Sequence, residues 1–254
     1  MATVLGDDVL VVDELTVDYG GFRANDQVSF NLREGAIHAL IGPNGAGKTT
    51  CFNAICGFTR PTGGSVRIKG RPVPPGNPHA VWASGVARTF QRLELFWTLS
   101  VRDNLALAAR RARKLRDRPA ADVEAILART GLGSVADDVV ANLPLGTCRV
   151  VELGRALATG ADILLLDESS SGLDRAETEA FEAIVRGVAR EFDLSVLLIE
   201  HDMEFVMALA DHIFVLDFGK LIAEGTPTEI QGSPVVHQVY LGGDLPEAVQ
   251  GEAP

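Results

Sequence analysis

The stretch GPNGAGKTT, residues 42–50, constrains this chain more than any other part of its sequence. It matches the glycine-rich pattern G-x-x-x-x-G-K-[ST] and stands between a strand-like run, AIHALI, and a helix-like run, TTCFNAICGF. Glycines let the backbone curl so that successive N–H groups point at phosphate oxygens, and a helix N-terminus adds positive potential there. The pattern therefore predicts a nucleotide-phosphate site formed by Gly42, Pro43, Asn44, Gly45, Ala46, Gly47, Lys48, Thr49 and Thr50.

A second apolar run, ILLLDE at residues 163–168, ends in two carboxylates. Acids at a strand end are often only solvated, but beside a phosphate-binding loop such a strand brings its acids to the phosphates. We expect Asp167 to hold Mg²⁺ through water, together with the Thr49 hydroxyl, and Glu168 to act as the general base that polarises the attacking water. Lys48 is expected to contact the β- and γ-phosphates.

The composition limits the partners and the cellular location. The chain has 254 residues, 46% of them apolar, and a net charge of -11, which disfavours a nucleic-acid partner. Its apolar runs are too short to span a bilayer and its N-terminus does not resemble a signal peptide, so we expect a cytoplasmic protein. The spacing of Cys51, Cys56 and Cys148 matches neither a zinc site nor a disulfide framework, and all three are expected to be buried thiols.

The order of the predicted elements indicates one α/β unit. Residues 4–40 alternate apolar and polar side chains as half-buried strands do, and after residue 159 strands alternate with helices. Residues 93–158 are mostly helical in pattern and contain the basic run RRARKLRDR at 110–118. That run is either a solvated helix face or a contact for acidic lipid headgroups or a membrane partner. The tail at 243–254 is small, polar and acidic, and is expected to be flexible.

Four further motifs resemble those of ATP-binding cassette (ABC) ATPases: RTFQ, LLLDE, SSGLD and LLIEHDM. The likeness covers about residues 9–242, and YGGFRANDQVSF and DHIFVLDFGKLIAEGTPTEI resemble the cassette of branched-chain (hydrophobic) amino acid importers. The resemblance implies an α/β fold with a P-loop NTPase (RecA-like) core, an N-terminal antiparallel β subdomain and an inserted helical subdomain at about 93–158. All of these belong to a single cassette at residues 1–242.

The resemblance also implies roles for side chains outside the phosphate-binding loop. Gln91 would sense the γ-phosphate through Mg²⁺ and water, and His201 would contact the γ-phosphate directly. Asp174 would cross to the other subunit of a dimer. Tyr19 is expected to stack on adenine; packing is its alternative role, and the nearby Phe22 is the less favoured candidate for stacking.

The family's Leu-Ser-Gly-Gly-Gln signature, which caps the γ-phosphate of the opposite subunit, is replaced here by Leu143, Pro144, Leu145, Gly146 and Thr147. Pro144 lacks both the hydroxyl and the N–H, and Leu145 replaces a glycine. The N–H groups of Gly146, Thr147 and Cys148 are expected to stay available at the start of the helix CRVVELGRALATG. We expect a weakened cap, in a heterodimer with a better signature or in a homodimer for which LPLGT is adequate. Ser169, where the family usually has proline, is expected to affect the stiffness of a turn and not a reacting group.

These motifs and the resemblance imply a subunit that binds ATP and Mg²⁺ and hydrolyses ATP to power a membrane importer. Its partners would be a second cassette, transmembrane permease subunits and, indirectly, a solute-binding protein, so it would lie on the inner face of the cell membrane. The permease is expected to dock around residues 93–100, where Phe96 and Trp97 are adjacent aromatics, although one of the two could instead pack inward. A weakly hydrolysing regulatory cassette in an asymmetric dimer and a soluble non-transport ABC ATPase are the alternative functions.

Overall fold

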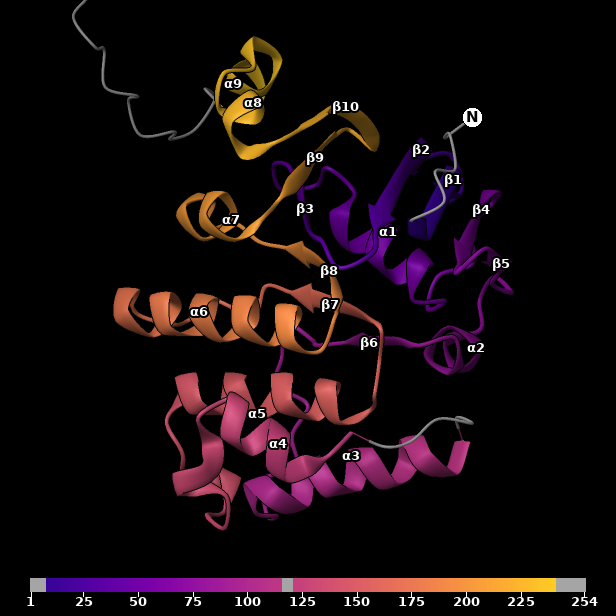
Figure 1. Cartoon of the computed structure of the whole chain (residues 1–254). Coiled ribbons are helices and arrows are strands. Elements are labelled where there is room, and N and C mark those ends of the chain that lie inside the picture. The colour runs from indigo at the N-terminus through magenta and orange to yellow at the C-terminus, as the bar shows by residue number, and fades with distance from the viewer. Residues whose placement is uncertain (1–7, 116–120, 241–254) are drawn as a thin grey trace, which may run out of the picture.

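The computed structural model describes residues 8–115 and 121–240, which form two sheets and their covering helices (Figure 1). The first sheet is antiparallel and has four strands, in the order β2 (Arg23–Arg33), β1 (Asp8–Asp18), β4 (Gly63–Ile68) and β5 (Arg71–Pro72). The second sheet has six strands, in the order β10 (Lys220–Gly225), β9 (His212–Asp217), β3 (Ile37–Ile41), β8 (Ser195–Ile199), β7 (Ile163–Asp167) and β6 (Val86–Arg88). Its neighbouring strands are parallel except β10 against β9.

The helices divide into those that cover the sheets and those that form a separate group. The first kind comprises α1 (Lys48–Ile55), α2 (Pro78–Ala83), α6 (Arg175–Glu191), α7 (Met203–Leu209), α8 (Pro227–Gln231) and α9 (Pro234–Tyr240). The second comprises α3 (Val101–Leu115), α4 (Val123–Arg129), the 3-10 turns η1 (Leu132–Val135) and η2 (Val140–Asn142), and α5 (Leu145–Ala158). The α/β fold with an antiparallel sheet and added helices confirms the fold class predicted from the sequence.

The central strands of the six-stranded sheet are buried on both faces, as continuous apolar runs in parallel sheets predict. Every residue of β3, β7 and β8 is buried. Because successive side chains point to opposite faces, Val196 and Leu198 of β8 pack into the core beneath α5, α6 and α7, whereas Leu197 and Ile199 pack into the core shared with α1 and the antiparallel sheet. The sheet is thus held from both sides.

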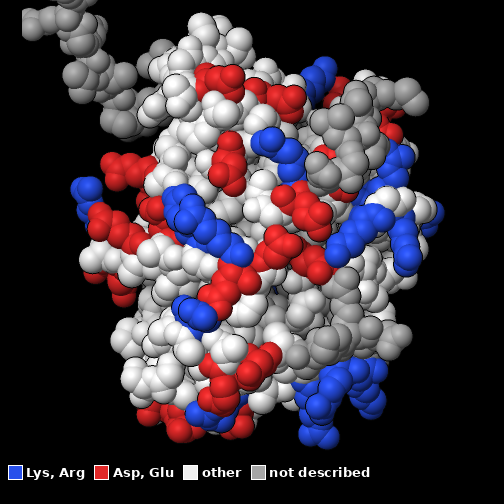
Figure 2. Space-filling view, in the orientation of Figure 1, with Lys and Arg blue, Asp and Glu red and all other residues white. Residues whose placement is uncertain are grey.

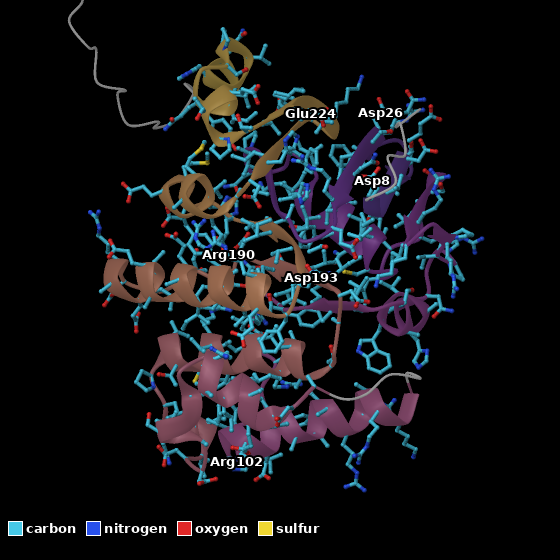
Figure 3. The ribbon with its side chains drawn as sticks, viewed as in Figure 1. Asp8, Asp26, Arg102, Arg190, Asp193 and Glu224 are labelled. Atoms are coloured by element: carbon cyan, nitrogen blue, oxygen red, sulfur yellow. The ribbon has the colours of Figure 1, made fainter. Side chains whose placement is uncertain are left out.

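The group formed by α3, α4 and α5 lies at one end of the molecule in Figure 1, away from the antiparallel sheet. Buried apolar side chains such as Leu105 and Ile126 hold it against the core. At the surface, Arg102 pairs with Glu124 and, at 2.9 Å, with Asp137; Figure 3 shows Arg102 at the base of this group. Exposed ion pairs contribute little, so apolar burial is the main contribution here. The boundaries 93–158 for this subdomain stay a prediction.

The surface carries both signs of charge, and Figure 2 shows Lys and Arg gathered at the lower right, where α3 runs in Figure 1. The described part of the basic run, Arg110, Arg111, Arg113 and Lys114, is exposed on α3, and its contact with lipid or a partner stays a prediction. None of the helices in the described ranges is long and apolar enough to cross a membrane. The three cysteines are buried, as predicted. The tail at 243–254 lies outside the described residues.

The sheet topology explains where a site can form. Strands β3, β8 and β7 are parallel neighbours, and Ile199 at the end of β8 is in register with Leu40 of β3 and Asp167 of β7. The loops that leave the carboxyl ends of these strands therefore meet at one edge of the sheet. Ligands of α/β sheets bind at this kind of edge.

Candidate nucleotide-binding site

The phosphate-binding loop joins β3 to α1, and its glycines adopt backbone angles that other residues rarely adopt. The φ angles are +152° at Gly42, +83° at Gly45 and +97° at Gly47. A Cβ atom on Gly42 would lie 2.1 Å from the carbonyl oxygen of Leu216, and one on Gly47 would lie 2.2 Å from that of Ala24. These two glycines are required for close backbone packing, whereas Gly45 has no described atom within 4 Å of such a position and borders open space.

Lys48 opens α1, and its side chain is buried against the loop that precedes it. Its Nζ donates to the carbonyl oxygens of Gly42 at 2.6 Å and of Pro43 at 3.0 Å. Burial lowers the pKa of the Lys48 ammonium, and the Glu168 carboxylate opposes that shift. Because its described hydrogen bonds go to neutral carbonyl groups, a phosphate would offer this ammonium a stronger, charge-assisted contact.

The loop borders a cavity of about 280 Å³ at the predicted edge of the sheet. It is lined by Phe22, Ala24, Asn44, Gly45, Ala46, Gly47, Lys48, Thr49, Thr50, Glu168 and His201. The structure thus brings loop residues 44–50 together with the predicted base and histidine, whereas Gly42 and Pro43 lie outside this lining. The aromatic side chain of this lining is Phe22, whereas Tyr19, another described residue, is 57% exposed on the same hairpin. The less favoured aromatic candidate therefore lies at the cavity, and the adenine-stacking role of Tyr19 stays a prediction.

The Glu168 carboxylate lies between the two side chains that the sequence places near the γ-phosphate. Gln91 Nε2 donates to Glu168 Oε2 at 2.6 Å, and His201 Nε2 lies 2.8 Å from Glu168 Oε1. Glu168 also has a φ of +48°, a strained angle for a residue with a side chain. Such strain persists where the surrounding structure fixes the conformation, and it is commonly found at functional sites. Glu168 and His201 line the cavity, and Gln91 contacts this lining through Glu168.

Asp167, at the end of β7, forms a buried ion pair that its motif does not reveal. Arg88 Nη2 donates to Asp167 Oδ2 at 2.6 Å, and each side chain is only 8% exposed. Arg88 Nη1 also donates to Asn53 Oδ1 at 2.7 Å. The guanidinium lies 5.2 to 5.7 Å from the ring centroids of Phe52, Phe58 and Phe90. Arg88 therefore fixes one oxygen of the carboxylate.

The backbone beside Asp167 is fastened by two hydroxyl groups. The N–H of Asp167 donates to Thr89 Oγ1 at 3.2 Å, and Thr89 Oγ1 lies 3.0 Å from Ser169 Oγ. Ser169 is buried. The Ser169 hydroxyl joins the turn after β7 to the end of β6, a contact that the sequence does not predict.

The predicted trans-acting segment stands apart from this cavity. Helix α5 begins at Leu145, three residues before the predicted CRVVELGRALATG, with Pro144 as its N-cap. The Cys148 N–H donates to the Pro144 carbonyl at 3.0 Å, so the prediction that it is free is wrong; helix formation uses it. Leu145 is 42% exposed, and one of its methyl carbons lies 3.0 Å from where a Cβ on Gly172 would be. Gly146 and Thr147 line a separate hollow beside Glu177.

Asp174 has a local role within its own chain. It is the N-cap of α6: its Oδ1 accepts from the Glu177 N–H at 2.8 Å, and the Glu177 carboxylate accepts from the Asp174 N–H at 3.1 Å. This reciprocal capping box holds the start of α6 in place. The contact of Asp174 with another subunit stays a prediction.

Sequence reasoning missed the residues that support the site from behind. Arg88 and Thr89 stood inside a quoted motif, but only the pairing of β6 with β7 shows that they reach Asp167. Glu200 is buried and accepts from the N–H of Ser170 at 2.9 Å and from its hydroxyl at 2.8 Å. Burial raises the pKa of the Glu200 carboxyl. The sequence offers one signal for Glu200, which is the position of this carboxylate between strand β8 and the predicted His201.

The oxygen donors at the site are of the kind that Mg²⁺ uses. Thr49 lines the cavity, whereas Asp167 lies outside this lining at the end of β7. Within the described ranges no group of three or more His, Cys, Asp or Glu side chains could hold a metal ion by itself. Mg²⁺ takes few protein ligands and completes its shell with water and phosphate oxygens. The Gln91 amide is engaged with Glu168.

Comparisons with known proteins agree with this geometry. The ABC transporter family model matches residues 25–171, and the branched-chain amino acid ATP-binding cassette transporter model matches residues 220–245. The high-affinity branched-chain amino acid transport ATP-binding protein LivG of Salmonella typhimurium is 39% identical over 92% of this chain and 98% of its own length. BraF of Pseudomonas aeruginosa, which has the same description, is 36% identical over the same shares.

Solved structures show the same fold. The ADP conformation of an ATP-binding cassette of an ABC transporter superimposes with a TM-score of 0.82 at 26% identity, covering 93% of this chain and 99% of that one. A nucleotide-free ATP-binding cassette superimposes with a TM-score of 0.81, covering 93% and 100%. The relatives extend over most of the fold described above, and the ABC transporter model matches more than half of the chain. This chain belongs to the ABC transporter family.

Proposed function

We propose that this chain binds and hydrolyses ATP with Mg²⁺ and powers an importer of branched-chain or related hydrophobic amino acids. The observation that carries the hydrolytic part is the placement of Glu168, which lines the loop cavity, between Gln91 and His201. The solute class rests on the relatives, which are named as branched-chain amino acid transport proteins. Those names support the transport function over the soluble, non-transport alternative.

Each side chain has a defined task in this proposal. The N–H groups of the loop and the Lys48 ammonium bind the phosphates, which replace the carbonyl contacts that Lys48 makes now. Glu168 orients and deprotonates the attacking water, and His201 donates to the γ-phosphate. Gln91 holds the carboxylate of Glu168 until that water arrives. Phosphoryl transfer is catalysed mainly by such positioning and by charge stabilisation.

The metal site would use the Thr49 hydroxyl and, through water, the free oxygen of Asp167. Bound Mg²⁺ would neutralise charge on the β- and γ-phosphates. Arg88 holds the other oxygen of Asp167, so this carboxylate is already oriented. Gln91, predicted as a third contact, donates through Nε2 to Glu168, and its Oε1 is the atom that would face the metal.

The test is Lys48→Ala in the full chain, with Lys69→Ala as a matched control because Lys69 pairs with Asp162 on another face. Lys48→Ala should lose most ATP binding and turnover, since the phosphates lose a buried point charge. Equilibrium binding of a fluorescent ATP analogue and release of phosphate measure the two quantities. Wild-type values in Lys48→Ala would rule out the proposed phosphate site.

A permease is proposed to dock in an apolar groove of about 620 Å³ between α2 and α3. The groove is lined by Phe58, Pro78, His79, Trp82, Phe96, Leu107, Ala108, Arg111, Arg155 and Thr159. Phe96, one of the two predicted anchors, is part of this lining, whereas Trp97 is 44% exposed beside it. Large aromatic side chains in a groove are favoured anchors for a partner helix. A cassette docked there would be peripheral on the inner face of the membrane.

Phe96→Ala should weaken copurification with the permease and leave ATP binding unchanged. Buried interface anchors typically cost about 2 kcal/mol or more when truncated, which is roughly 30-fold in affinity. Phe218→Ala is the control, because Phe218 is 86% exposed on the turn between β9 and β10. Equal recovery of the permease with both variants would show that the permease does not dock in this groove.

A second candidate, the weakly hydrolysing regulatory cassette, is favoured by one observation. At the start of α5, Pro144 has no N–H and the exposed Leu145 stands where a phosphate would approach. Such a chain would need a second cassette with a better signature. Turnover in the assembled complex separates the two: ATP hydrolysis that stops when Glu168 of this chain alone is changed assigns catalysis to this subunit.

A further inference from the structure

Helix α5 carries two buried, oppositely charged side chains that face the segment around Gln91. Arg149 and Glu152 are each 6% exposed, and Arg149 Nη1 lies 3.6 Å from Glu152 Oε2. A buried ion pair is expensive to desolvate and contributes little to stability by itself. The role of this pair is therefore to be found in the further hydrogen bonds that the two side chains make. We call residues 90–94 the Gln91 segment.

Glu152 holds the Gln91 segment by its backbone amides. Its Oε1 accepts from the N–H of Phe90 at 3.3 Å and from the N–H of Glu94 at 3.4 Å. These amides lie on either side of Gln91. Burial raises the pKa of the Glu152 carboxyl, and the two N–H groups and Arg149 oppose that shift.

Arg149 holds the same segment by its carbonyl groups. Its Nη1 donates to the Phe90 oxygen at 3.4 Å, and its Nη2 donates to the Gln91 oxygen at 3.2 Å. The same Nη2 donates to the Ser171 oxygen at 3.2 Å, in the loop that leads to α6. One guanidinium thus joins α5, the Gln91 segment and the loop after Glu168.

We propose that Arg149 and Glu152 are positioning residues that fasten the Gln91 segment to α5 and so hold the Gln91 side chain on Glu168. Neither side chain touches a reacting group. Both hold the backbone of Gln91 in place, and the Gln91 side chain in turn donates from Nε2 to Glu168 at 2.6 Å. Because the segment LPLGT opens the same helix, a shift of α5 carries Gln91 with it. Contact at the start of α5 is thereby converted into a change at the general base of the same subunit. Only this catalytic consequence rests on the proposed function.

Amide hydrogen exchange in the full chain tests the fastening directly. Glu152→Ala removes the acceptor of the Phe90 and Glu94 amides and should speed their exchange about tenfold or more. Glu229→Ala is the matched control, because Glu229 also accepts a backbone N–H, that of Thr226 at 2.7 Å. It should speed exchange at Thr226 and leave the Gln91 segment unchanged.

Arg149→Lys provides a second variant that keeps the charge beside Glu152. A lysine lacks the fork that reaches both Gln91 and Ser171, so exchange at Phe90 and Glu94 should also rise. Unchanged exchange at these amides in a folded Glu152→Ala or Arg149→Lys protein overturns the proposal.

Kinetics separate positioning from general damage. In Glu152→Ala, kcat should fall about tenfold, while ATP affinity measured in EDTA stays within about twofold of wild type. An equal fall in rate and affinity would indicate disruption of the fold and overturn the positioning role. If the wild-type chain binds no ATP, the proposed function fails, but the exchange result still stands for the fastening.

Discussion

Two helices of this chain begin where a phosphate is expected, and they differ in one residue that decides how the phosphate is received. Neither α1 nor α5 has a side-chain cap, so each presents free N–H groups and the positive end of its dipole. The first residue of α1 is Lys48, a buried cation, whereas the first residue of α5 is Leu145, which is 42% exposed and apolar. We therefore expect the start of α1 to bind phosphate more strongly than the start of α5.

The largest expected effect tests the α1 side of this comparison. Glu168→Gln should retain ATP binding but slow hydrolysis by about 10²- to 10⁴-fold, because a general base is lost while the phosphate contacts remain. Phosphate release under saturating ATP measures it. Glu204→Gln, an exposed change on α7, is the control. Wild-type turnover in Glu168→Gln would show that Glu168 is not the general base. The phosphate site at α1 would then differ from the start of α5 in binding only, and not in catalysis.

The next effect tests the α5 side. Pro144→Ser with Leu145→Gly should raise hydrolysis at the facing nucleotide, because the restored hydroxyl adds a charge-assisted hydrogen bond worth about 1.5–3 kcal/mol. Expressed fully in the transition state, this is about 10- to 100-fold in rate; expressed equally in bound ATP, it tightens binding instead. Rate and affinity must be measured together in the complex.

Pro144→Ser alone is the companion variant for that experiment. It keeps Leu145 against the Gly172 position and so isolates the hydroxyl from the loss of this packing. A fall in both rate and affinity for the double variant, with the fold intact by circular dichroism, would show that the start of α5 is adapted to Pro144 and is not weakened.

The smallest effect concerns the stability of the fold in acid. It is expected to come from strand β3, which leads into α1, and not from α5. His38 is buried in β3, the strand that leads into the phosphate-binding loop, and burial lowers its pKa from 6.5 to about 4, with His212 and Arg33 adding to the shift and Asp211 opposing it. As the pH falls, His38 is protonated in the unfolded chain before it is protonated in the folded one. The stability that the neutral, buried His38 contributes is therefore present above pH 6.5 and is lost as the pH falls toward 4. Between pH 6.5 and 5 the loss should be about 2 kcal/mol.

Urea unfolding at these two pH values measures that loss, and His38→Gln should reduce it. No histidine occurs in residues 101–158, so no histidine of helix α5 contributes to this loss of unfolding free energy. An unchanged pH dependence in His38→Gln would show that other groups cause the acid sensitivity.

The parts of the site that lie within one strand–loop–helix unit could be predicted from the sequence. The loop, Lys48 and the Asp167–Glu168 pair follow from short patterns, because neighbouring residues fix their geometry. The pattern predicts that α5 starts at Cys148, three residues later than the observed start at Leu145, because no side-chain cap marks the true start. Sequence patterns describe local order well and helix ends less well.

Contacts between distant segments could not be predicted in this way. Arg88 and Asp167 are separated by 79 positions, and Thr89 and Ser169 by 80, so only strand pairing brings them together. The choice between Tyr19 and Phe22 depends on how a hairpin turn directs two side chains, which composition does not encode. Resemblance supplied roles for Gln91 and His201, but the carboxylate that joins them had to be seen in three dimensions.

The buried pair of Arg88 and Asp167 restricts how this sequence can drift over generations. Removing one partner of such a pair typically costs about 3–5 kcal/mol, a large fraction of the roughly 5–15 kcal/mol that stabilises a whole domain. A chain that loses Arg88 by a single substitution would therefore be impaired in folding even where no ATP is present. The two positions can change only together, so a duplicated copy freed from catalysis would be expected to lose both charges or to keep both.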